Sequence, residues 1–389
     1  MNFPKIPHTD YLTGEKFQAL CDVDCEKDRE WKQKIAGAPT KLISVYAQTH
    51  ELKNVVPFLA FQKDKRFIVM SHNSDGLFYD AKKKGSLRSF DYAWQPVENV
   101  VQWLCQNCEV DDPTVAPLPI GVENSYIFKP EVKLALMQKL READAPKEPK
   151  MFMCFNPGTN KPQRESAYKR FTGLPWVMSC EGFNNINLVR PYFENMAKCQ
   201  FVLCPDGNGI DTHRPWEALY MGCIPIVFRH VSMEDFSSHL PIIVIENYDE
   251  LTEQFILDKA KKLEFLENTF HWNFLTIGYW KENFQKQIKK IKEALLIEEL
   301  KKHRKSEDHI VISAQDVEVL KRQFGEFASK EPSASVETTP DVNTPGCDLK
   351  VVDKKWLRDL PPGFGPNHSK WNVPSLRQCY QIAYGLPIT

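Results

Sequence analysis

The sequence lacks an excess of either charge, and it lacks any long apolar run. Its 50 Lys and Arg residues balance 51 Asp and Glu residues. Nucleic-acid-binding domains usually carry concentrated positive charge, so this balance argues against a nucleic-acid partner. The best candidate for a membrane span, around Ile224–Phe228, falls short of the roughly 18 residues required and is interrupted by Gly222 and Pro225. Residues Met1–Lys5 are not followed by the apolar core of a signal peptide. We therefore expect a soluble, cytoplasmic protein without a membrane span.

Three cofactor-binding and catalytic motifs are also missing. No Gly-x-Gly-x-x-Gly follows the first predicted strand, and neither Gly-x4-Gly-Lys-Ser/Thr nor His-Glu-x-x-His occurs. These absences argue against a dehydrogenase or a nucleotide hydrolase. The chain of 389 residues is long enough for two domains with full hydrophobic cores, which excludes a small scaffold held by disulfides.

The eleven cysteines show no pattern of a disulfide or zinc framework. Cys154, Cys204 and Cys223 lie in apolar runs, where a free thiol acts as a small hydrophobic side chain. Such usage is typical of a reducing compartment. The pairs in Cys21–Cys25 and Cys105–Cys108 resemble two halves of a zinc site, but no His lies at ligand spacing beside them. We interpret all of them as ordinary reduced cysteines.

Short β-branched runs alternate with amphipathic stretches along most of the chain. The pattern predicts strands over 41–46, 66–71, 150–155, 176–179, 200–204, 224–228 and 241–245, with short elements at 99–104 and 117–120. It predicts helices over 54–61, 130–142, 164–171, 189–198 and 215–221, and another from about residue 248. This alternation predicts parallel sheets covered by helices, an α/β fold. Ligands of such sheets bind beyond the carboxyl ends of the strands.

A polar, proline-containing stretch at 143–149 predicts a linker between two domains. We therefore predict a Rossmann-like acceptor domain over 1–146 and a Rossmann-like donor domain over 147–280, facing each other across a cleft. Helices are predicted over 281–325, followed by a linker and tail over 326–389. The first of these helices is basic and amphipathic, which fits packing on the domain or, alternatively, binding to a membrane or to calmodulin.

The most informative segment is Phe201–Phe228, in which a buried strand leads through a glycine-rich loop into a helix. Pro215 fits the first helical position, which places His213 and Arg214 directly before the helix, and Gly222 fits the position that ends it. A helix N-terminus exposes free N–H groups, and a guanidinium grips phosphate oxygens in pairs. The segment therefore predicts an anion site suited to a nucleotide diphosphate.

Neighbouring residues extend this prediction to a nucleotide sugar. Glu217, one turn into the helix, can accept hydrogen bonds from ribose hydroxyls, and Asp211 can orient His213. The alternative is a simple helix cap in which Arg214 and Glu217 form a surface ion pair. Arg164 and Asn156 follow the first strand of the second domain and are further candidates. The predicted donor-binding residues are Gly207, Asn208, Gly209, Asp211, Thr212, His213, Arg214, Glu217, Asn156 and Arg164.

Residues 206–227 (DGNGIDTHRPWEALYMGCIPIV) resemble the donor-binding signature of exostosin-like glycosyltransferases, family 47 and its relatives. Segments 70–76, 103–124 and 152–161 are similar to viral and bacterial members, so the resemblance spans roughly residues 40–280. It implies the GT-B architecture and a hexosyl- or pentosyltransferase that uses a nucleotide sugar, UDP-linked in our interpretation. The implied acceptor is a glycan or a glycosylated molecule, and the implied reaction inverts the anomeric centre without a metal.

An inverting transfer needs a base that takes the acceptor's proton. His72 and Asp75 directly follow a predicted strand, on the side where ligands bind, so either is a candidate; Glu123 is a third. The alternative is a turn in which Asn73 and Asp75 bond only to their own backbone. Arg214 is predicted to stabilise the leaving diphosphate. For the whole chain, the alternative is a catalytically inactive GT-B-like protein that binds a sugar or a partner.

Overall fold

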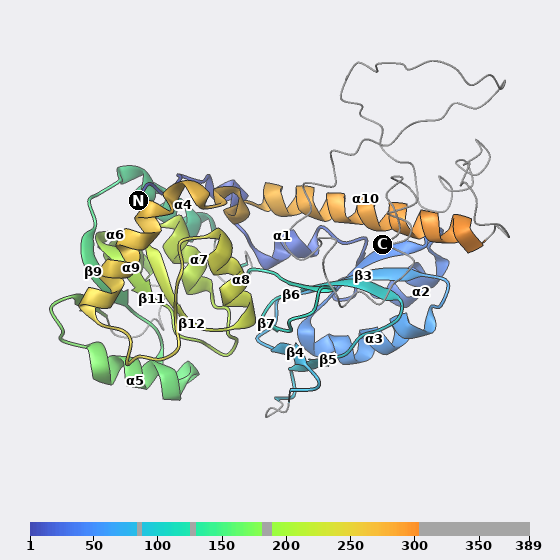
Figure 1. Cartoon of the computed structure of the whole chain (residues 1–389), viewed down its shortest axis with the longest axis horizontal. Helices are drawn as coiled ribbons and strands as arrows, with labels where there is room; N and C mark the ends of the chain where they lie inside the picture. Colours follow the sequence, from blue (N-terminus) through green and yellow to red (C-terminus); the bar gives the residue numbers. More distant parts are fainter. Residues whose placement is uncertain (84–87, 125–129, 181–188, 303–389) are drawn as a thin grey trace, which may run out of the picture. The chain divides into compact units, whose positions relative to one another are not determined.

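The computed structural model describes residues 1–83, 88–124, 130–180 and 189–302 (Figure 1). Residues 1–36 and 43–284 form one compact unit, and a second unit contains 37–42 and the chain from 285. The predicted tail over 326–389, and the predicted helical residues beyond 302, lie outside the described residues. All three sheets described below belong to the first unit, apart from Leu42, the first residue of one strand.

The first large sheet has five strands whose spatial order follows the chain. They are β1 (Val23–Asp24), β2 (Leu42–Ala47), β3 (Arg66–Ser71), β6 (Val100–Cys105) and β8 (Val115–Pro117). Strand β1 pairs with β2, β3 with β6 and β6 with β8, each in parallel. A smaller parallel sheet has the order β5 (Tyr92–Trp94), β4 (Phe78–Asp80) and β7 (Cys108–Glu109).

The second large sheet has a strand order that reverses once. Its strands, in spatial order, are β10 (Val177–Ser179), β9 (Glu148–Met153), β11 (Cys199–Leu203), β12 (Ile224–Phe228) and β13 (Ile243–Ile245), all parallel. The chain leaves β9 toward β10 on one side and later returns to β11 on the other. The loops after β9 and β11 therefore diverge, and such a switch point is where open parallel sheets bind ligands.

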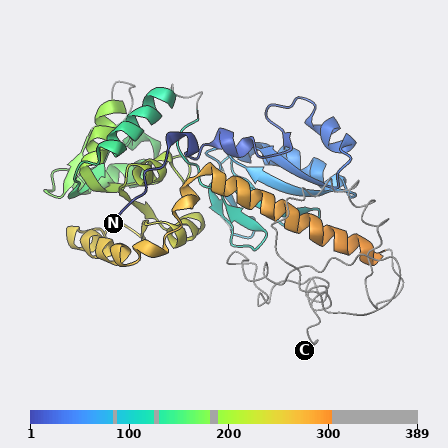
Figure 2. The same cartoon turned by 90° about the horizontal axis from the view of Figure 1, so that it is seen from above.

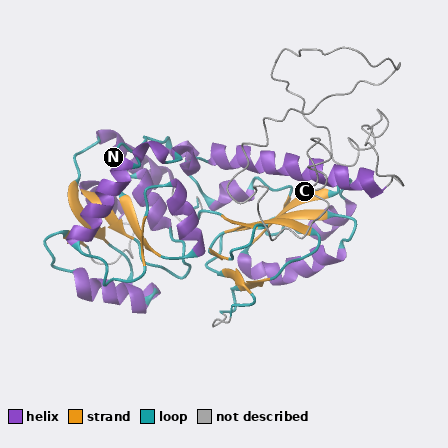
Figure 3. Ribbon diagram, viewed as in Figure 1, coloured by secondary structure: helices purple, strands orange, loops and turns teal. Residues whose placement is uncertain are grey.

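Helices alternate with these strands (Figure 3). Their bounds are α1 (Gly14–Gln18), α2 (Trp31–Gly37), α3 (Leu52–Phe61), α4 (Pro130–Ala143), α5 (Lys161–Phe171), α6 (Val189–Lys198), α7 (His213–Tyr220), α8 (Val231–His239), α9 (Glu253–Phe265) and α10 (Ile277–Lys302). Short 3₁₀ turns are η1 (His8–Asp10), η2 (Thr49–Glu51), η3 (Pro157–Thr159), η5 (Glu267–Thr269) and η6 (Trp272–Leu275). Helices α6 and α7 both contact β11, and α8 contacts β13.

Two helices packed on the second sheet differ in how much of their surface is buried. Helix α6 buries Val189, Tyr192, Phe193 and Met196, a spacing of one helical face. Helix α7 is buried from Pro215 through Tyr220, so it is enclosed rather than lying on the surface. Full burial of a large apolar side chain contributes about 1.5–3 kcal/mol relative to exposure. The short helix α7 is therefore anchored firmly beside β11.

The α/β fold of parallel sheets is confirmed, and most predicted elements lie within two residues of the observed ones. The element predicted at 117–120 is displaced, because β8 ends at Pro117. The helix predicted from about residue 248 begins instead at Glu253. A turn precedes it, in which Glu250 Oε1 accepts the N–H groups of Glu246 and Asn247.

The longest helix, α10, runs unbroken from Ile277 to Lys302 (Figure 2). It begins four residues before the predicted start at 281. Within the part of the chain that the structure describes, no helix combines the length and the apolar character needed to cross a membrane.

The prediction that Cys154 is a free thiol is wrong. It forms a disulfide with Cys180, with 5.2 Å between the Cα atoms. Because β9 and β10 pair in parallel, the residues that follow the two strands come side by side, a relation that 26 residues of sequence separation conceal. Cys204 and Cys223 are free thiols, as predicted.

Candidate anion-binding site

Helix α7 begins at the switch point of the second sheet, after the loop that leaves β11. It starts at His213, two residues earlier than predicted, so the placement of Pro215 at the first helical position is wrong. Proline is tolerated throughout the first turn because those N–H groups have no partner inside the helix. The predicted end is confirmed: Gly222 has φ +70° and donates its N–H to the carbonyl of Leu219 at 3.0 Å.

Two guanidinium groups lie against one aromatic ring at this switch point. The Cζ atoms of Arg164 and Arg214 are 5.7 and 5.4 Å from the ring centroid of Phe155, two residues beyond β9. Arg164 belongs to α5 and Arg214 to α7, so both sides of the switch point contribute a cation. Attraction to the ring stabilises each guanidinium, whereas the two positive charges repel each other.

Arg164 is buried, with 6% of its surface exposed. Its Nε donates to the carbonyl of Asp206 at 2.8 Å, and a terminal nitrogen donates to the carbonyl of Asn156 at 3.2 Å. Both acceptors are main-chain carbonyls, which orient the guanidinium without neutralising it. Burial, together with the charge of Arg214, lowers the pKa of Arg164 to about 10, so it stays protonated at neutral pH.

Arg214 and Thr212 present hydrogen-bond donors that the protein leaves unused. Among the described residues, the buried Nε of Arg214 and the buried Oγ1 of Thr212 have no hydrogen-bond partner. Thr212 is the N-cap of α7, yet its side chain does not cap the helix. Burial acts to lower the pKa of Arg214, but Tyr192 and other neighbouring groups outweigh it and raise the pKa. Since an unpaired buried donor costs about 1–3 kcal/mol, this arrangement indicates a ligand that accepts hydrogen bonds.

The glycines of the preceding loop make room for side chains. A Cβ on Gly207 would lie 3.0 Å from a terminal nitrogen of Arg164 and 3.2 Å from Cγ2 of Thr212. A Cβ on Gly209 would come within 2.6 Å of the amide of Asn107. The lack of a side chain at both positions allows a close approach to neighbouring protein groups. At Gly207 it brings the loop against the guanidinium of Arg164.

Asp211 connects this loop to the first sheet. Its N–H donates to Oδ1 of Asn107 at 2.9 Å, while its own carboxylate accepts from the N–H of Ile120 at 2.6 Å and from Nε1 of Trp216 at 2.8 Å. Burial raises the pKa of Asp211 to about 7. The sequence suggested that Asp211 orients His213. In the structure, the Asp211 carboxylate instead accepts hydrogen bonds from Ile120 and Trp216.

His213 also bonds to the first half of the chain. Its Nδ1 donates to the carbonyl of Gly121 at 2.8 Å. Burial lowers its pKa, which favours the neutral imidazole at neutral pH. The predicted role of His213 in donor binding stays a prediction.

Glu217 belongs to a second charged cluster, which we call the Lys133 cluster and define as Lys133, Glu123, Glu217 and Tyr192. The Nζ atom of Lys133 lies 2.6 Å from Glu217 and 2.7 Å from Glu123. The other oxygen of Glu217 accepts from the Tyr192 hydroxyl at 2.7 Å. Burial acts to raise the pKa of Glu217, but Lys133 outweighs it and lowers the pKa. The alternative interpretation of Arg214 and Glu217 as a surface ion pair is wrong, because Glu217 is buried and pairs with Lys133.

The three candidate bases differ in access. His72 is fully buried: its Nε2 donates to the carbonyl of Pro119 at 3.0 Å, and its Nδ1 accepts from the N–H of Asn73 at 2.8 Å. Burial lowers the pKa of His72 to about 4. Glu123 is engaged by Lys133. Asp75 is exposed, and its carboxylate accepts from the side-chain amide of Asn208 at 3.0 Å. The structure thus brings Asp75 to the glycine-rich loop.

Sequence reasoning missed Phe155, Asp206 and Lys133. An aromatic residue directly after a predicted strand was a usable signal for Phe155, since it lies at the end of the sheet where ligands bind. Lys133 carried no local signal, because its helix meets α7 only through tertiary packing. Among the described residues, no group of three or more His, Cys, Asp and Glu side chains could hold a metal ion.

No protein-family profile fits the chain, and no curated protein is significantly similar to it.

Proposed function

We propose that this chain is a GT-B glycosyltransferase that moves a sugar from a nucleotide sugar, UDP-linked, to a glycan or glycosylated acceptor. The observation that carries the proposal is the pair Arg164 and Arg214 at the switch point, where Nε of Arg214 and Oγ1 of Thr212 are buried without a partner among the described residues. A diphosphate supplies both the negative charge and the hydrogen-bond acceptors that this arrangement lacks. The resemblance of residues 206–227 to a donor-binding signature favours a sugar nucleotide over other phosphate compounds.

In the proposed reaction, the bond between the anomeric carbon and the diphosphate oxygen breaks as an acceptor hydroxyl attacks from the opposite face. Negative charge grows on the departing diphosphate. Arg214, the Thr212 hydroxyl and the uncapped start of α7 are fixed before the reaction and stabilise that charge. Removal of one such preorganised donor typically costs about 10²–10³ in rate. The two guanidinium groups supply the positive charge, so we expect transfer to continue in the presence of EDTA.

We assign the role of base to Asp75. Its carboxylate is exposed and lies beside the loop that leads to Arg214, through the bond to Asn208. His72 is less suitable, because both ring nitrogens are engaged and a pKa of about 4 makes it a weak base. In the proposed mechanism, Asp75 takes the hydroxyl proton as the new glycosidic bond forms.

Binding and transfer are measured separately on the purified chain. UDP should raise the melting temperature of the wild type, because a ligand of the native state stabilises it by mass action. UDP release in the presence of UDP-sugars and glycan acceptors then reports transfer. The matched control is Arg190→Ala, which removes a surface arginine paired with Glu194 on α6. No shift with any nucleotide would contradict the proposal. A shift without transfer for any acceptor would favour the inactive sugar-binding alternative.

A further inference from the structure

His230 lies between two carboxylates that come from different sheets. It is the N-cap of α8 and follows β12 by two residues. Its Nε2 lies 3.0 Å from Oδ2 of Asp206, and its Nδ1 lies 3.3 Å from Oε1 of Glu109. Asp206 is in the loop after β11, whereas Glu109 is the last residue of β7 in the small sheet. A doubly protonated imidazole satisfies both carboxylates at once.

Asp206 connects His230 to the anion site. Its carbonyl accepts from Nε of Arg164 at 2.8 Å. The neighbouring side chain on α5, Gln163, donates to the Asp206 carboxylate at 2.9 Å and accepts the Asp206 N–H at 2.9 Å. Consecutive residues of α5 thus hold the same aspartate. A displacement of Asp206 must therefore move the acceptor that orients the guanidinium of Arg164.

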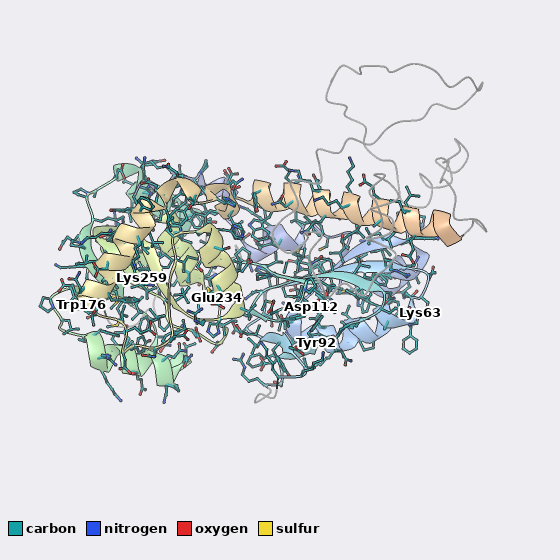
Figure 4. All side chains as sticks on the ribbon, in the orientation of Figure 1. Lys63, Tyr92, Asp112, Trp176, Glu234 and Lys259 are labelled. Carbon is teal, nitrogen blue, oxygen red and sulfur yellow. A yellow bond between two sulfur atoms is a disulfide. The ribbon has the colours of Figure 1, made fainter. Side chains whose placement is uncertain are left out.

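Glu109 contacts His230 on the side opposite Asp206. The same oxygen that meets His230 accepts the N–H of Val231, the first residue of α8, at 2.9 Å. A carboxylate at a helix N-terminus is stabilised by the free N–H groups and the helix dipole. Elsewhere on α8, Glu234, which is labelled in Figure 4, has its charge balanced locally. It is paired with Arg229. Glu109 and Asp206 are the carboxylates that face the imidazole directly.

We infer that His230 is a positioning residue: as an imidazolium it joins Asp206 to Glu109, and through Asp206 it sets the orientation of Arg164 at the anion site. The identity of the anion rests on the proposed function, but the link from His230 to Arg164 does not. Loss of the proton leaves two carboxylates around a neutral ring that can donate to only one of them. Asp206 is then held less firmly, and diphosphate binds more weakly.

The window of pH for this effect follows from the charges around His230. Burial acts to lower its pKa, but the hydrogen bonds and charges of Asp206 and Glu109 outweigh it and raise the pKa from 6.5 to about 9. The stability that the ion pairs contribute is therefore complete below pH 6.5 and is lost as the pH rises through 9.

Other titratable groups near His230 change charge in different ranges of pH. Asp211 interacts with its charge and has a pKa raised by burial to about 7; Asp235 on α8 has a pKa raised by burial to about 6. Lys83 contacts the carbonyl of Glu109 at 3.5 Å. Arg164 itself has a pKa of about 10, so its own loss of charge overlaps the upper end of the window of His230, in the wild type and in the variants alike. Comparison with a variant that lacks the imidazole separates these contributions.

The experiment compares the full-length wild type with His230→Gln and with the control His271→Gln, which replaces an exposed histidine. Calorimetry measures the affinity for UDP and for inorganic pyrophosphate between pH 7.5 and 9.5. Nuclear magnetic resonance of ¹⁵N-arginine-labelled protein follows the Nε–H signal of Arg164, assigned with Arg164→Lys. For the wild type and the control, we expect affinity to fall about five- to tenfold over this range, with the Arg164 signal shifting at a midpoint near 9.

His230→Gln should bind UDP weakly already at pH 7.5 and lose the transition of the Arg164 signal. Should this variant fail to fold, Glu109→Gln tests the same link, because loss of one carboxylate should lower the midpoint of the Arg164 signal. An Arg164 signal with the same pH profile in the wild type and in the folded variant would overturn the inference. If the wild type binds neither UDP nor pyrophosphate, the proposed function fails, while a transition of Arg164 that depends on His230 still supports the positioning role.

Discussion

The two five-stranded sheets differ in strand order, and Arg214, whose buried Nε has no partner among the described residues, lies at the sheet whose order reverses. In the first sheet the strands follow chain order, from β1 to β8. In the second sheet the order reverses between β9 and β11. Where the strand order follows the chain, the loops after neighbouring strands lead in the same direction. Where the order reverses, the loops after two neighbouring strands lead in opposite directions and leave room for a ligand between them. Arg164 and Arg214 lie at that reversal.

Polar side chains also follow the strands of the first sheet, but they bond mainly to the protein itself. His72, Asn73 and Asn107 each have partners in the main chain or in neighbouring side chains. Gln106 is an exception, since its buried Oε1 lacks a partner among the described residues, but an unpaired acceptor does not attract an anion. A polar residue after a strand is therefore a weak indicator of a site, and an unpaired buried donor is a stronger one.

Arg214→Ala tests the second sheet and should have the largest effect. We expect the transfer rate to fall by about 10³, because the variant loses a charged donor aimed at the leaving diphosphate. The fold should be retained at a modest cost in stability, because the variant loses the interactions of Arg214 with Tyr192 and with the ring of Phe155 but is relieved of repulsion with Arg164. Urea denaturation and assays of UDP release measure the two quantities. A stable variant with an unchanged transfer rate would contradict the assignment of Arg214 to the site.

His72→Ala is the matching test of the first sheet, and the opposite outcome is expected. The variant should lose about 3 kcal/mol of stability, because it leaves a cavity and strips the Pro119 carbonyl and the Asn73 N–H of their partner. The affinity of the folded protein for UDP should stay within about twofold. Urea denaturation measures the stability. Calorimetry, under conditions in which the variant is fully folded, measures the affinity for UDP. A loss of affinity without a loss of stability would place His72 at the ligand.

Asp75→Asn separates catalysis from binding. We expect transfer to slow by about 100-fold, since the amide cannot accept the hydroxyl proton. UDP affinity should be unchanged, because Asp75 contacts the loop only through Asn208. Steady-state kinetics and UDP titration provide the two readouts. Equal losses in both would assign the base to another residue.

Asp211→Asn probes a contact that joins the two sheets. Because the folded protein raises the pKa of Asp211 from 3.8 to about 7, its protonated form is favoured and stability falls as the pH rises through this range. The variant should abolish that fall, which is on the order of 4 kcal/mol between pH 4 and 7. Urea denaturation across this range measures it. An identical slope in the wild type and the variant would show that another group titrates.

The fold was largely predictable because its strands and helices have strong local patterns. The strand at Ile224–Phe228 and the helix at Val189–Lys198 match their predicted bounds. Short strands such as β4 and β7 escaped prediction because a few residues carry no periodicity. The helix α8 was missed as well, although its N-cap, His230, is the residue on which the further inference rests.

The site was predictable only in part. The glycine-rich loop and Arg214 lie in one continuous segment, so the sequence could group them. Arg164 comes from α5 and Phe155 from the segment before it, and the strand order of the second sheet brings both to Arg214. The sequence also placed Glu217 with Arg214, whereas tertiary packing with Lys133 gives Glu217 partners within the protein. Partners that are distant in sequence decide which charges are neutralised.

The central claim is that the guanidinium groups at the reversal of the second sheet bind a diphosphate. Calorimetric titration of the wild type and of Arg214→Ala with uridine, UMP and UDP tests it most directly. The claim predicts that wild-type affinity increases with each phosphate and that the variant loses most of that increase. Equal binding of uridine and UDP to the wild type, or an undiminished preference for UDP in the variant, would contradict it.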